Sequence, residues 1–356
     1  MDRGLRRDRL AARLEELGAD AFLVTHLPNV RYLCGYTGSN GQALIAREGA
    51  RFFTDGRYTE QSRREVPDME RLSYGGDGFP AMLQEACSQL GVSRVAFEAS
   101  FLTYKQFQDF SDRVGELIPA RDEVGRLRWV KDAEELALIE EAQAITDTGF
   151  KAILPELREG VTERELARDL ERRLEEHGAE GPAFDTIAAF GEDAAEPHHQ
   201  PTDRALRHGD IVKLDFGARY DGYHSDMTRT VAFGEPSHEL RTVYALVREA
   251  QQVGIDAVRA GVRGKDVDRA ARAVIEAAGY GEAFGHGLGH GVGLEIHEGP
   301  TLSSTFEGEL PAGAVVTVEP GIYLPGIGGV RIEDMVEVTD EGCRVLPATQ
   351  KELVIV

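Results

Sequence analysis

Cysteine is scarce in this chain, with only Cys34, Cys87 and Cys343 among its 356 residues. The three are far apart, their number is odd, and no Cys-x-x-Cys spacing occurs. This pattern argues against a disulfide framework and against a zinc site built from thiolates. We therefore expect a protein of a reducing compartment, the cytoplasm.

Long apolar runs and an excess of positive charge are also missing. No apolar stretch reaches the roughly 18 residues of a transmembrane helix. The first 18 residues are charged and amphipathic, unlike a secretory signal. The chain has 62 acidic and 40 basic side chains, a net charge of −22. Acid spread along the whole chain argues against nucleic acid or an anionic membrane as a partner and is typical of a soluble protein.

The chain is long enough for two domains, and its patterning changes near residue 126. Residues 1–125 alternate helix and strand signals, which predicts an α/β domain. An amphipathic helix should end at Gly18. The strands expected after it are 21–25, 43–46, 51–55 and 94–98.

Residues 126–356 predict an α+β domain with a mainly antiparallel sheet, because strands with hairpin signals alternate with long helices. The capping-box pairs Asp132/Glu135 and Thr162/Glu165 mark two helix starts. Further helices are expected at 237–259 and 265–278, and strands at 185–190, 211–216, 225–232, 314–318, 330–338 and 350–356.

Five side chains of metal-binding type occur in this second region, each in a segment that reads as a strand or its edge: Asp215, Asp226, His290, Glu319 and Glu333. Four carboxylates and one imidazole form a hard, oxygen-rich set of ligands. Such a set suits two divalent cations side by side, and paired cations suit metal-assisted hydrolysis.

The first two acids flank a two-residue hairpin signal at 221–222. Counting outward from this turn places Asp226 opposite Gly217. Asp215 then lies two residues from Gly217, so the two carboxylates are diagonal neighbours on one face of the sheet. The alternative is that both are ordinary acids beside a turn.

The other three candidates are weaker when each is taken alone. Glu319 ends an apolar strand, where a carboxylate is costly to bury unless it is paired or bound to a metal. Glu333 shares a predicted strand face with Arg331 and Met335, and an acid in such a place is commonly a salt-bridged surface residue. His290 lies in a glycine-rich segment, and glycines allow the backbone to approach closely around a cleft.

Further histidines accompany His290: His286 and His297 lie in the same segment, and His198 and His199 follow Pro197 in a loop. A lone histidine is more often structural than catalytic. Several histidines together with distant carboxylates favour a site.

Four segments that carry these residues resemble the pita-bread metallopeptidases, and among them the Xaa-Pro peptidases, prolidase and aminopeptidase P. The segments are LDFGARYDGYHSDMTRT, HGLGHGVGLEIHE, VVTVEPGIY and GVRIEDM, and NVRYLCGYTGS and FFTDGRYTEQ resemble the N-terminal domain of that family. The resemblance implies a pita-bread catalytic domain over 126–356, preceded by a smaller creatinase-like α/β domain over 1–125.

The resemblance also implies roles for the metal-type residues. Asp215 would hold one metal ion, Asp226 and Glu333 would bridge two, and His290 and Glu319 would complete the other site. The ions would activate water, and Glu319 could also carry its proton.

For the remaining residues, the resemblance implies that His198, His286 and His297 position the scissile carbonyl and stabilise the developing oxyanion. Arg331 would orient the metal ligands. Phe184 and Tyr323 are candidate walls of a proline pocket, although both could be core aromatics.

The expected substrate is a peptide with proline in second position, because an Xaa-Pro bond lacks the N–H that ordinary peptidases bind. We favour Xaa-Pro dipeptides, since the chain is compact, with short peptides cut by an aminopeptidase P as the alternative. Methionine aminopeptidase, a metal-free creatinase-like hydrolase and a non-catalytic pita-bread binding module are more remote alternatives. Mn²⁺ is the expected metal, with Co²⁺ or Zn²⁺ also compatible, and a homodimer is the expected assembly.

Overall fold

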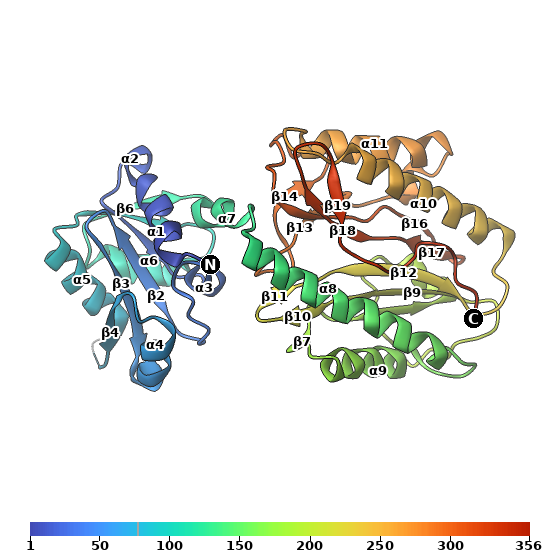
Figure 1. Cartoon of the computed structure of the whole chain (residues 1–356), viewed down its shortest axis with the longest axis horizontal. Coiled ribbons are helices and arrows are strands. Elements are labelled where there is room, and N and C mark those ends of the chain that lie inside the picture. Colours follow the sequence, from blue (N-terminus) through green and yellow to red (C-terminus); the bar gives the residue numbers. More distant parts are fainter. Residues whose placement is uncertain (77) are drawn as a thin grey trace. The chain divides into compact units, whose positions relative to one another are not determined.

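The computed structural model describes residues 1–76 and 78–356. The chain folds into two units, Met1–Arg128 and Trp129–Val356, which Figure 1 colours along the sequence. No helix within the described residues is both long and apolar enough to cross a membrane.

The first unit contains a six-stranded mixed sheet in the order β4-β3-β2-β1-β5-β6. Its strands are β1 (Ala21–Val24), β2 (Gln42–Ala46), β3 (Gly49–Asp55), β4 (Glu70–Tyr74), β5 (Arg94–Glu98) and β6 (Glu116–Ala120). Its helices are α1 (Arg3–Ala12), α2 (Leu14–Leu17), α3 (Leu27–Cys34), α4 (Thr59–Glu65), α5 (Gly78–Leu90), α6 (Tyr104–Ser111) and α7 (Glu123–Arg128), with a 3₁₀ turn η1 (Gly56–Tyr58).

All four strands predicted for this unit are confirmed, and β4 and β6 were missed. These two strands form the edges of the sheet and are largely exposed, so they lack the apolar pattern that identified the inner strands. The predicted first helix is interrupted at Arg13, and it ends as expected at Gly18, whose φ is +64°.

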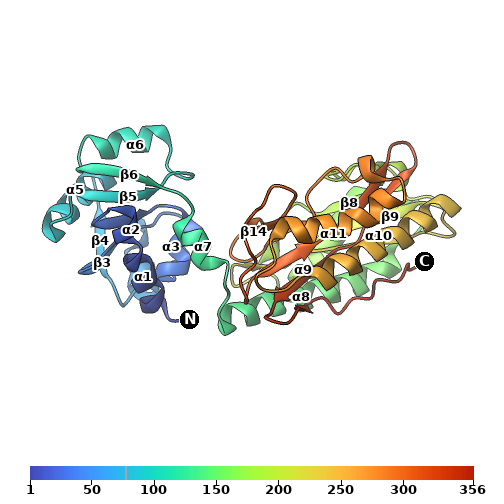
Figure 2. The same cartoon turned by 90° about the horizontal axis from the view of Figure 1, so that it is seen from above.

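Helices cover both faces of this sheet. Apolar residues of α5 and α6, including Leu83 and Phe110, form one core with Leu23, Leu44 and Phe53 of the sheet. Helices α1 and α3 contact β2 and lie on the side away from α6, as Figure 2 shows. The layered α/β arrangement expected here is therefore confirmed.

The second unit repeats a pattern of two helices followed by strands. Its helices are α8 (Ala133–Ile153), α9 (Glu163–Glu176), α10 (His238–Ala257) and α11 (Gly264–Ala277), with 3₁₀ turns η2 (Leu154–Glu156), η3 (Gly191–Ala195) and η4 (Gly281–Ala283). The strands of the first half are β7 (Gly181–Pro182), β8 (Ile187–Phe190), β9 (Ile211–Phe216), β10 (Ala218–Tyr220), β11 (Tyr223–His224) and β12 (Met227–Ala232). Those of the second half are β13 (Gly289–Gly291), β14 (Glu298–Leu302), β15 (Val315–Val318), β16 (Gly321–Leu324), β17 (Gly328–Arg331), β18 (Asp334–Val338) and β19 (Cys343–Val345).

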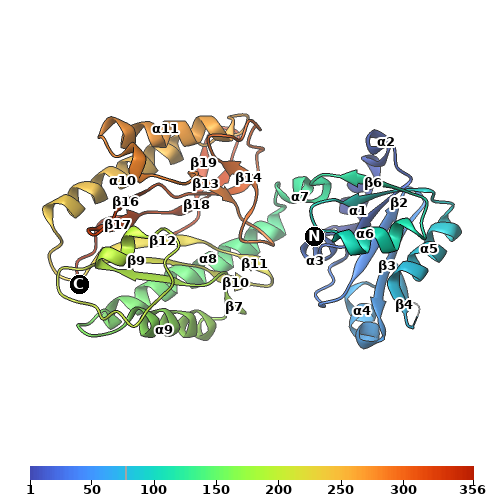
Figure 3. The same cartoon turned by 180° about the vertical axis from the view of Figure 1, so that it is seen from behind.

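Each helix pair packs on the strands of its own half. Helix α9 contacts β7 and β8, whereas α10 contacts β15, β16 and β17. Figure 2 shows α8 and α10 on one side of the strands, and Figure 3 views this unit from behind. All named strand pairs here are antiparallel, so the predicted α+β class is confirmed. Both predicted capping boxes are present, at Asp132 and Thr162.

Of the strands predicted for this unit, 330–338 is split into two and 350–356 does not form. The segment 330–338 breaks at Ile332–Glu333, because β17 pairs with β16 while β18 pairs with β15 in another sheet. The segment 350–356 forms only an isolated bridge, between Ala232 and Ile355. Side chains bind its early carbonyls instead: Arg229 donates to that of Gln350, and Tyr244 to that of Lys351.

Candidate active site

The predicted site residues converge on one cavity of about 450 Å³ in the second unit. It is lined by all five metal-type residues and by the predicted accessory residues, namely Asp215, Asp226, His290, Glu319, Glu333, His198, His286, His297 and Arg331. They come from both halves of the unit, so neither half alone holds the set.

The hairpin of β10 and β11 places the two aspartates as its turn predicted. Tyr220 pairs with Tyr223, and further along Met227 pairs with Phe216, so a single register runs through the whole ladder. Asp226 therefore lies opposite Gly217, and the predicted diagonal arrangement with Asp215 is confirmed. Both carboxylates are buried.

His290 and Glu319 come together from β13 and the end of β15. The Nε2 atom of His290 lies 3.3 Å from Oε1 of Glu319 and 3.6 Å from Oδ2 of Asp226. The hydroxyl of Thr317 donates to Glu319 at 3.1 Å and accepts from the backbone N–H of His290 at 3.0 Å. Thr317 thus holds both residues in one orientation.

Glu333 lies at the break between β17 and β18, and this break directs it to the cavity. Its backbone N–H donates to the carbonyl of Thr228 at 3.1 Å, and the Thr228 hydroxyl donates to Glu333 Oε2 at 2.7 Å. Thr228 lies two residues after Asp226, so its bonds to Glu333 connect the two segments that carry these acids. Thr228 and Thr317 were not predicted from the sequence, although each lies two residues from a candidate ligand.

Ionising all the acids of the cavity together costs more free energy than ionising exposed acids. Burial raises the pKa of Asp226 well above 3.8, and the charges of Glu333 and Asp215 raise it further. Burial also raises the pKa of Glu333 well above 4.5, with Glu319 and Asp215 adding to the effect. A divalent cation bound by these acids would offset this cost.

His290 and Glu319 instead stabilise each other as an ion pair. Burial favours the neutral form of Glu319, but the hydrogen bond and charge of His290 lower the pKa of Glu319 to about 2. Burial likewise lowers the pKa of His290, and Glu319 outweighs this and raises it above 6.5. A bound cation would replace the proton of His290, since a ligand imidazole is neutral.

The donor set fits divalent cations. One oxygen or nitrogen each from Asp226, His290 and Glu333 lie within 4.8 Å of one another. Among the described residues, the buried Oδ1 of Asp215 has no hydrogen-bond partner. An orphaned carboxylate oxygen beside such a cluster is expected where a metal ion binds.

Arg331 links the ligands to the rest of the cavity wall. Its guanidinium pairs with Asp215, donates to the Tyr323 hydroxyl at 2.8 Å and to the Thr228 hydroxyl at 3.0 Å. It also donates to the carbonyl of Pro197 at 3.2 Å. A single buried arginine therefore orients a ligand and the loop before His198.

The accessory histidines differ in how they are held. His286 Nε2 lies 2.9 Å from the Tyr323 hydroxyl, and burial lowers the pKa of His286 below 6.5. His297 packs against His290 with ring centroids 4.4 Å apart, and burial followed by the charge of His290 lowers the pKa of His297. Both shifts favour the neutral form of the ring. His198 is exposed within the cavity.

The two suggested pocket walls are placed differently. Phe184 lines the cavity, together with Ile187 and Ile296, which the sequence analysis did not single out. Tyr323 is buried and is absent from the lining of this cavity, so its hydroxyl serves His286 and Arg331 instead.

Comparison with known proteins follows the division into two units. Residues 137–340 match the model of metallopeptidase family M24, and residues 6–130 match that of the creatinase/prolidase N-terminal domain. These matches bear out the predicted pita-bread catalytic region and the creatinase-like region before it.

Similar proteins cover the whole chain. A solved structure, "Xaa-Pro dipeptidase from Bacillus anthracis", is 40% identical with a TM-score of 0.98 and 100% of both chains covered. The X-Pro aminopeptidase of Thermotoga maritima MSB8 is 39% identical with a TM-score of 0.90, over 97% of this chain and 100% of that one. The "Uncharacterized peptidase YqhT" of Bacillus subtilis is 41% identical over 342 residues, which is 96% of this chain and 97% of that protein. The chain therefore belongs to metallopeptidase family M24.

Proposed function

We propose that this enzyme hydrolyses the bond between an N-terminal residue and proline, with Xaa-Pro dipeptides as the preferred substrates. The observation that carries the proposal is the convergence of Asp215, Asp226, His290, Glu319 and Glu333 on one cavity. The names of similar proteins support the choice of proline, because solved structures of an Xaa-Pro dipeptidase and an X-Pro aminopeptidase both match over nearly all of the chain.

The residues have the following proposed roles. Asp215 would hold one divalent cation, Asp226 and Glu333 would bridge two, and His290 and Glu319 would complete the second site. When bound, the cations lower the pKa of water and polarise the scissile carbonyl. The Asp226 and Glu333 pKa shifts support this assignment, since buried acids of like charge need a cation.

The accessory histidines act on the substrate. We assign to His198, His286 and His297 the positioning of the scissile carbonyl and the stabilisation of its developing negative charge. Tyr323 supports His286 through its hydroxyl, and Arg331 orients Asp215. Glu319 would take up a proton from the attacking water.

The substrate test compares three peptides on protein reconstituted with Mn²⁺: Ala-Pro, Ala-Pro-Ala and Met-Ala-Ser. We expect release of alanine from Ala-Pro and little cleavage of Met-Ala-Ser. Faster cleavage of Ala-Pro-Ala than of Ala-Pro would favour the aminopeptidase alternative, to which the Thermotoga relative points. Cleavage of Met-Ala-Ser alone would overturn the proposal.

The metal test uses His290→Ala. Loss of this ligand should lower kcat/KM on Ala-Pro by about 10³-fold, because a metal ion contributes several kcal/mol to such reactions. Metal analysis should show less than the wild-type amount of bound metal. His238→Ala, at the exposed start of α10, is the control and should keep wild-type activity. Full activity in His290→Ala would exclude the proposed site.

Four further parts of the proposal concern the whole protein. We propose Mn²⁺ as the native metal, because the ligands are mainly oxygens, and the cytoplasm as the compartment, because cysteines are few. We also propose a homodimer, and two domains divided near residue 126. Metal analysis of protein purified without chelators tests the identity of the metal. Light scattering during size-exclusion chromatography tests the homodimer.

A further inference from the structure

His198 lines the cavity, and its ring makes no hydrogen bond or ion pair with another described residue. Its ring is exposed and, within residues 1–76 and 78–356, accepts and donates no hydrogen bond to the protein. The position of this ring is therefore set by the backbone of the loop that carries it, between η3 and β9. The contacts that hold this loop therefore determine the position of His198.

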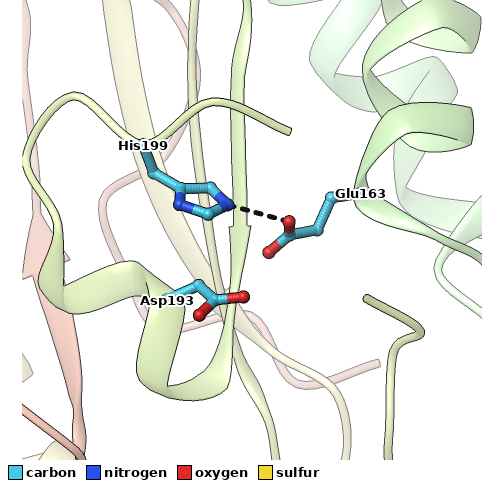
Figure 4. A group of neighbouring side chains, drawn as sticks. All are labelled: Glu163, Asp193 and His199. Atoms are coloured by element: carbon cyan, nitrogen blue, oxygen red, sulfur yellow. Dashed lines mark hydrogen bonds and ion pairs between the residues drawn. The ribbon is translucent and has the colours of Figure 1, made fainter. Parts of the chain in front are cut away.

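Buried charged side chains anchor the loop on both sides of His198. On one side, Arg331 donates to the Pro197 carbonyl at 3.2 Å. On the other, the ring of His199 points at Glu163, with Nε2 2.8 Å from Oε2 (Figure 4). His199 is only 5% exposed, so its backbone cannot move without breaking this contact.

Glu163 is well placed to act as a fixed point. It is fully buried in the first turn of α9, where a carboxylate is also favoured by the helix dipole. Its Oε1 accepts the backbone N–H of Phe190 at 2.8 Å. Its Oε2 accepts the N–H and hydroxyl of Thr202, at 2.9 and 2.8 Å. The carboxylate thus joins the loop at Thr202 and the end of β8 at Phe190 to the start of α9.

A metal ion is the alternative explanation of this cluster, because Glu163, Asp193 and His199 offer ligand atoms within 4.8 Å of one another. The hydrogen bonds argue against it. A carboxylate has about four acceptor positions, and Glu163 already accepts from His199, Thr202 and Phe190. Asp193 already lies near a cation, since the Arg204 guanidinium, which pairs with Asp210 at 2.9 Å, is 3.6 Å from it.

The surroundings of His199 favour its protonated ring over the neutral ring. Its Nδ1 lies 3.2 Å from Glu196 Oε2, so both ring nitrogens face carboxylates. Carboxylates only accept hydrogen bonds, and both nitrogens donate only in the protonated ring. Burial lowers the pKa of His199, but the hydrogen bonds to Glu163 and Glu196 outweigh it and leave the pKa raised above 6.5.

We propose that the buried pair of His199 and Glu163 is a positioning device that holds His198 at the reaction centre. The inference rests on the proposed function, in which His198 contacts the substrate. His199 itself does not line the cavity and is a positioning residue, not a catalytic one. Its effect on the reaction passes through His198.

A double-mutant cycle tests this path of action. On Mn²⁺-loaded protein with Ala-Pro, His199→Ala should lower kcat by about 10-fold or more, as for other residues that orient active groups. In a chain that already carries His198→Ala, the same substitution should change kcat by less than about 2-fold, because there is no ring left to position. His199→Gln keeps an amide donor for Glu163 and should recover most of the lost kcat.

Asp193→Asn is the matched control, since it lies in the same cluster but outside the pair. It should keep near wild-type kcat and metal content. A loss of bound metal in Asp193→Asn equal to that in His199→Ala would favour a metal ion and overturn the proposal. An equal loss of kcat from His199→Ala in both backgrounds would also overturn it, and so would full activity of His198→Ala.

A second readout does not depend on activity. In protein labelled with ¹³C-histidine, the ring signals of His198, identified by their absence in His198→Ala, should shift in His199→Ala and stay in place in Asp193→Asn. Unchanged His198 signals in His199→Ala would overturn the anchoring. Anchoring seen by NMR in a wild-type protein that does not cleave Ala-Pro would refute the proposed function alone.

Discussion

At the scale of single residues, the metal-type side chains are arranged at the expense of stability. Asp226 and Glu333 are buried among other acids, and burial is the largest cause of their raised pKa values. The Thr228 hydroxyl donates a hydrogen bond to Glu333 at 2.7 Å. A bound cation would stabilise the ionised form of these acids. Without a cation, bound protons stabilise their neutral form.

This leads to a prediction for the pH dependence of the metal-free protein. Because the folded-state pKa of Asp226 is raised above 3.8, the folded chain binds more protons than the unfolded chain at pH values between the two. Its stability contribution is present at low pH and is lost as pH rises through that window. The asparagine of Asp226→Asn does not titrate, so this variant does not lose that contribution. The Tm of the variant minus the Tm of the wild type should therefore increase as pH rises.

Differential scanning fluorimetry in EDTA across pH 4 to 8 measures this effect. Asp340→Asn, at an exposed acid near the end of β18, is the control and should show a Tm difference that is constant with pH. A Tm difference that is also constant for Asp226→Asn would contradict the prediction.

At the scale of elements, a buried ion pair joins β12 and β18, the strands that begin directly after Asp226 and Glu333. Arg229 of β12 pairs with Asp334 of β18 at 2.7 Å, and both are at most 2% exposed. Arg229 also donates to the backbone carbonyl of Glu333. The pair therefore fixes the distance between β12 and β18, and with it the distance between Asp226 and Glu333, which precede these strands.

We expect Arg229→Met to lower the free energy of unfolding by about 3–5 kcal/mol, because it leaves a buried carboxylate without its main partner. Urea denaturation followed by the fluorescence of Trp129, the only tryptophan, reports on the second unit. Arg344→Met removes an exposed pair with Glu140 and should change this energy by less than about 1 kcal/mol. Equal effects of the two substitutions would contradict the stabilising role of the ion pair between Arg229 and Asp334.

Helix caps and turns could be predicted because they depend on a few consecutive residues. Strands whose limits depend on their pairing partners could not. The caps at Asp132 and Thr162 and the turn at 221–222 are local, and all appear where expected. The segment 330–338 is apolar enough for one strand, but its two halves pair with different partners. No pattern within the segment marks the break at Glu333.

At the scale of the whole molecule, the active site couples the two halves of the second unit. Asp215 and Asp226 belong to the first half, and His290, Glu319 and Glu333 belong to the second. A cation held by both sets would join them, so metal binding should stabilise the fold. The gain is RT ln(1 + [L]/Kd), about 2.7 kcal/mol when the metal is at 100 times its Kd.

We therefore expect Mn²⁺ to raise the Tm of the chelator-treated protein in a concentration-dependent way. The same titration on Glu333→Gln should give a much smaller shift, because one bridging carboxylate is lost. Glu337→Gln, further along β18, is the control and should respond as the wild type does. A Tm that does not respond to Mn²⁺, Co²⁺ or Zn²⁺ would argue against a metal centre formed from both halves.

The sequence by itself determined the kinds and order of the metal-type residues, the helix caps and the register of the hairpin between Asp215 and Asp226. These depend on nearest neighbours, where turn and capping geometry leave few choices. Only the tertiary structure decided that Arg331 would reach Asp215, 116 residues away, and that Glu163 would anchor the loop of His198 through His199. Such pairs depend on how buried charges are satisfied once the sheets pack, and that requirement has no local pattern.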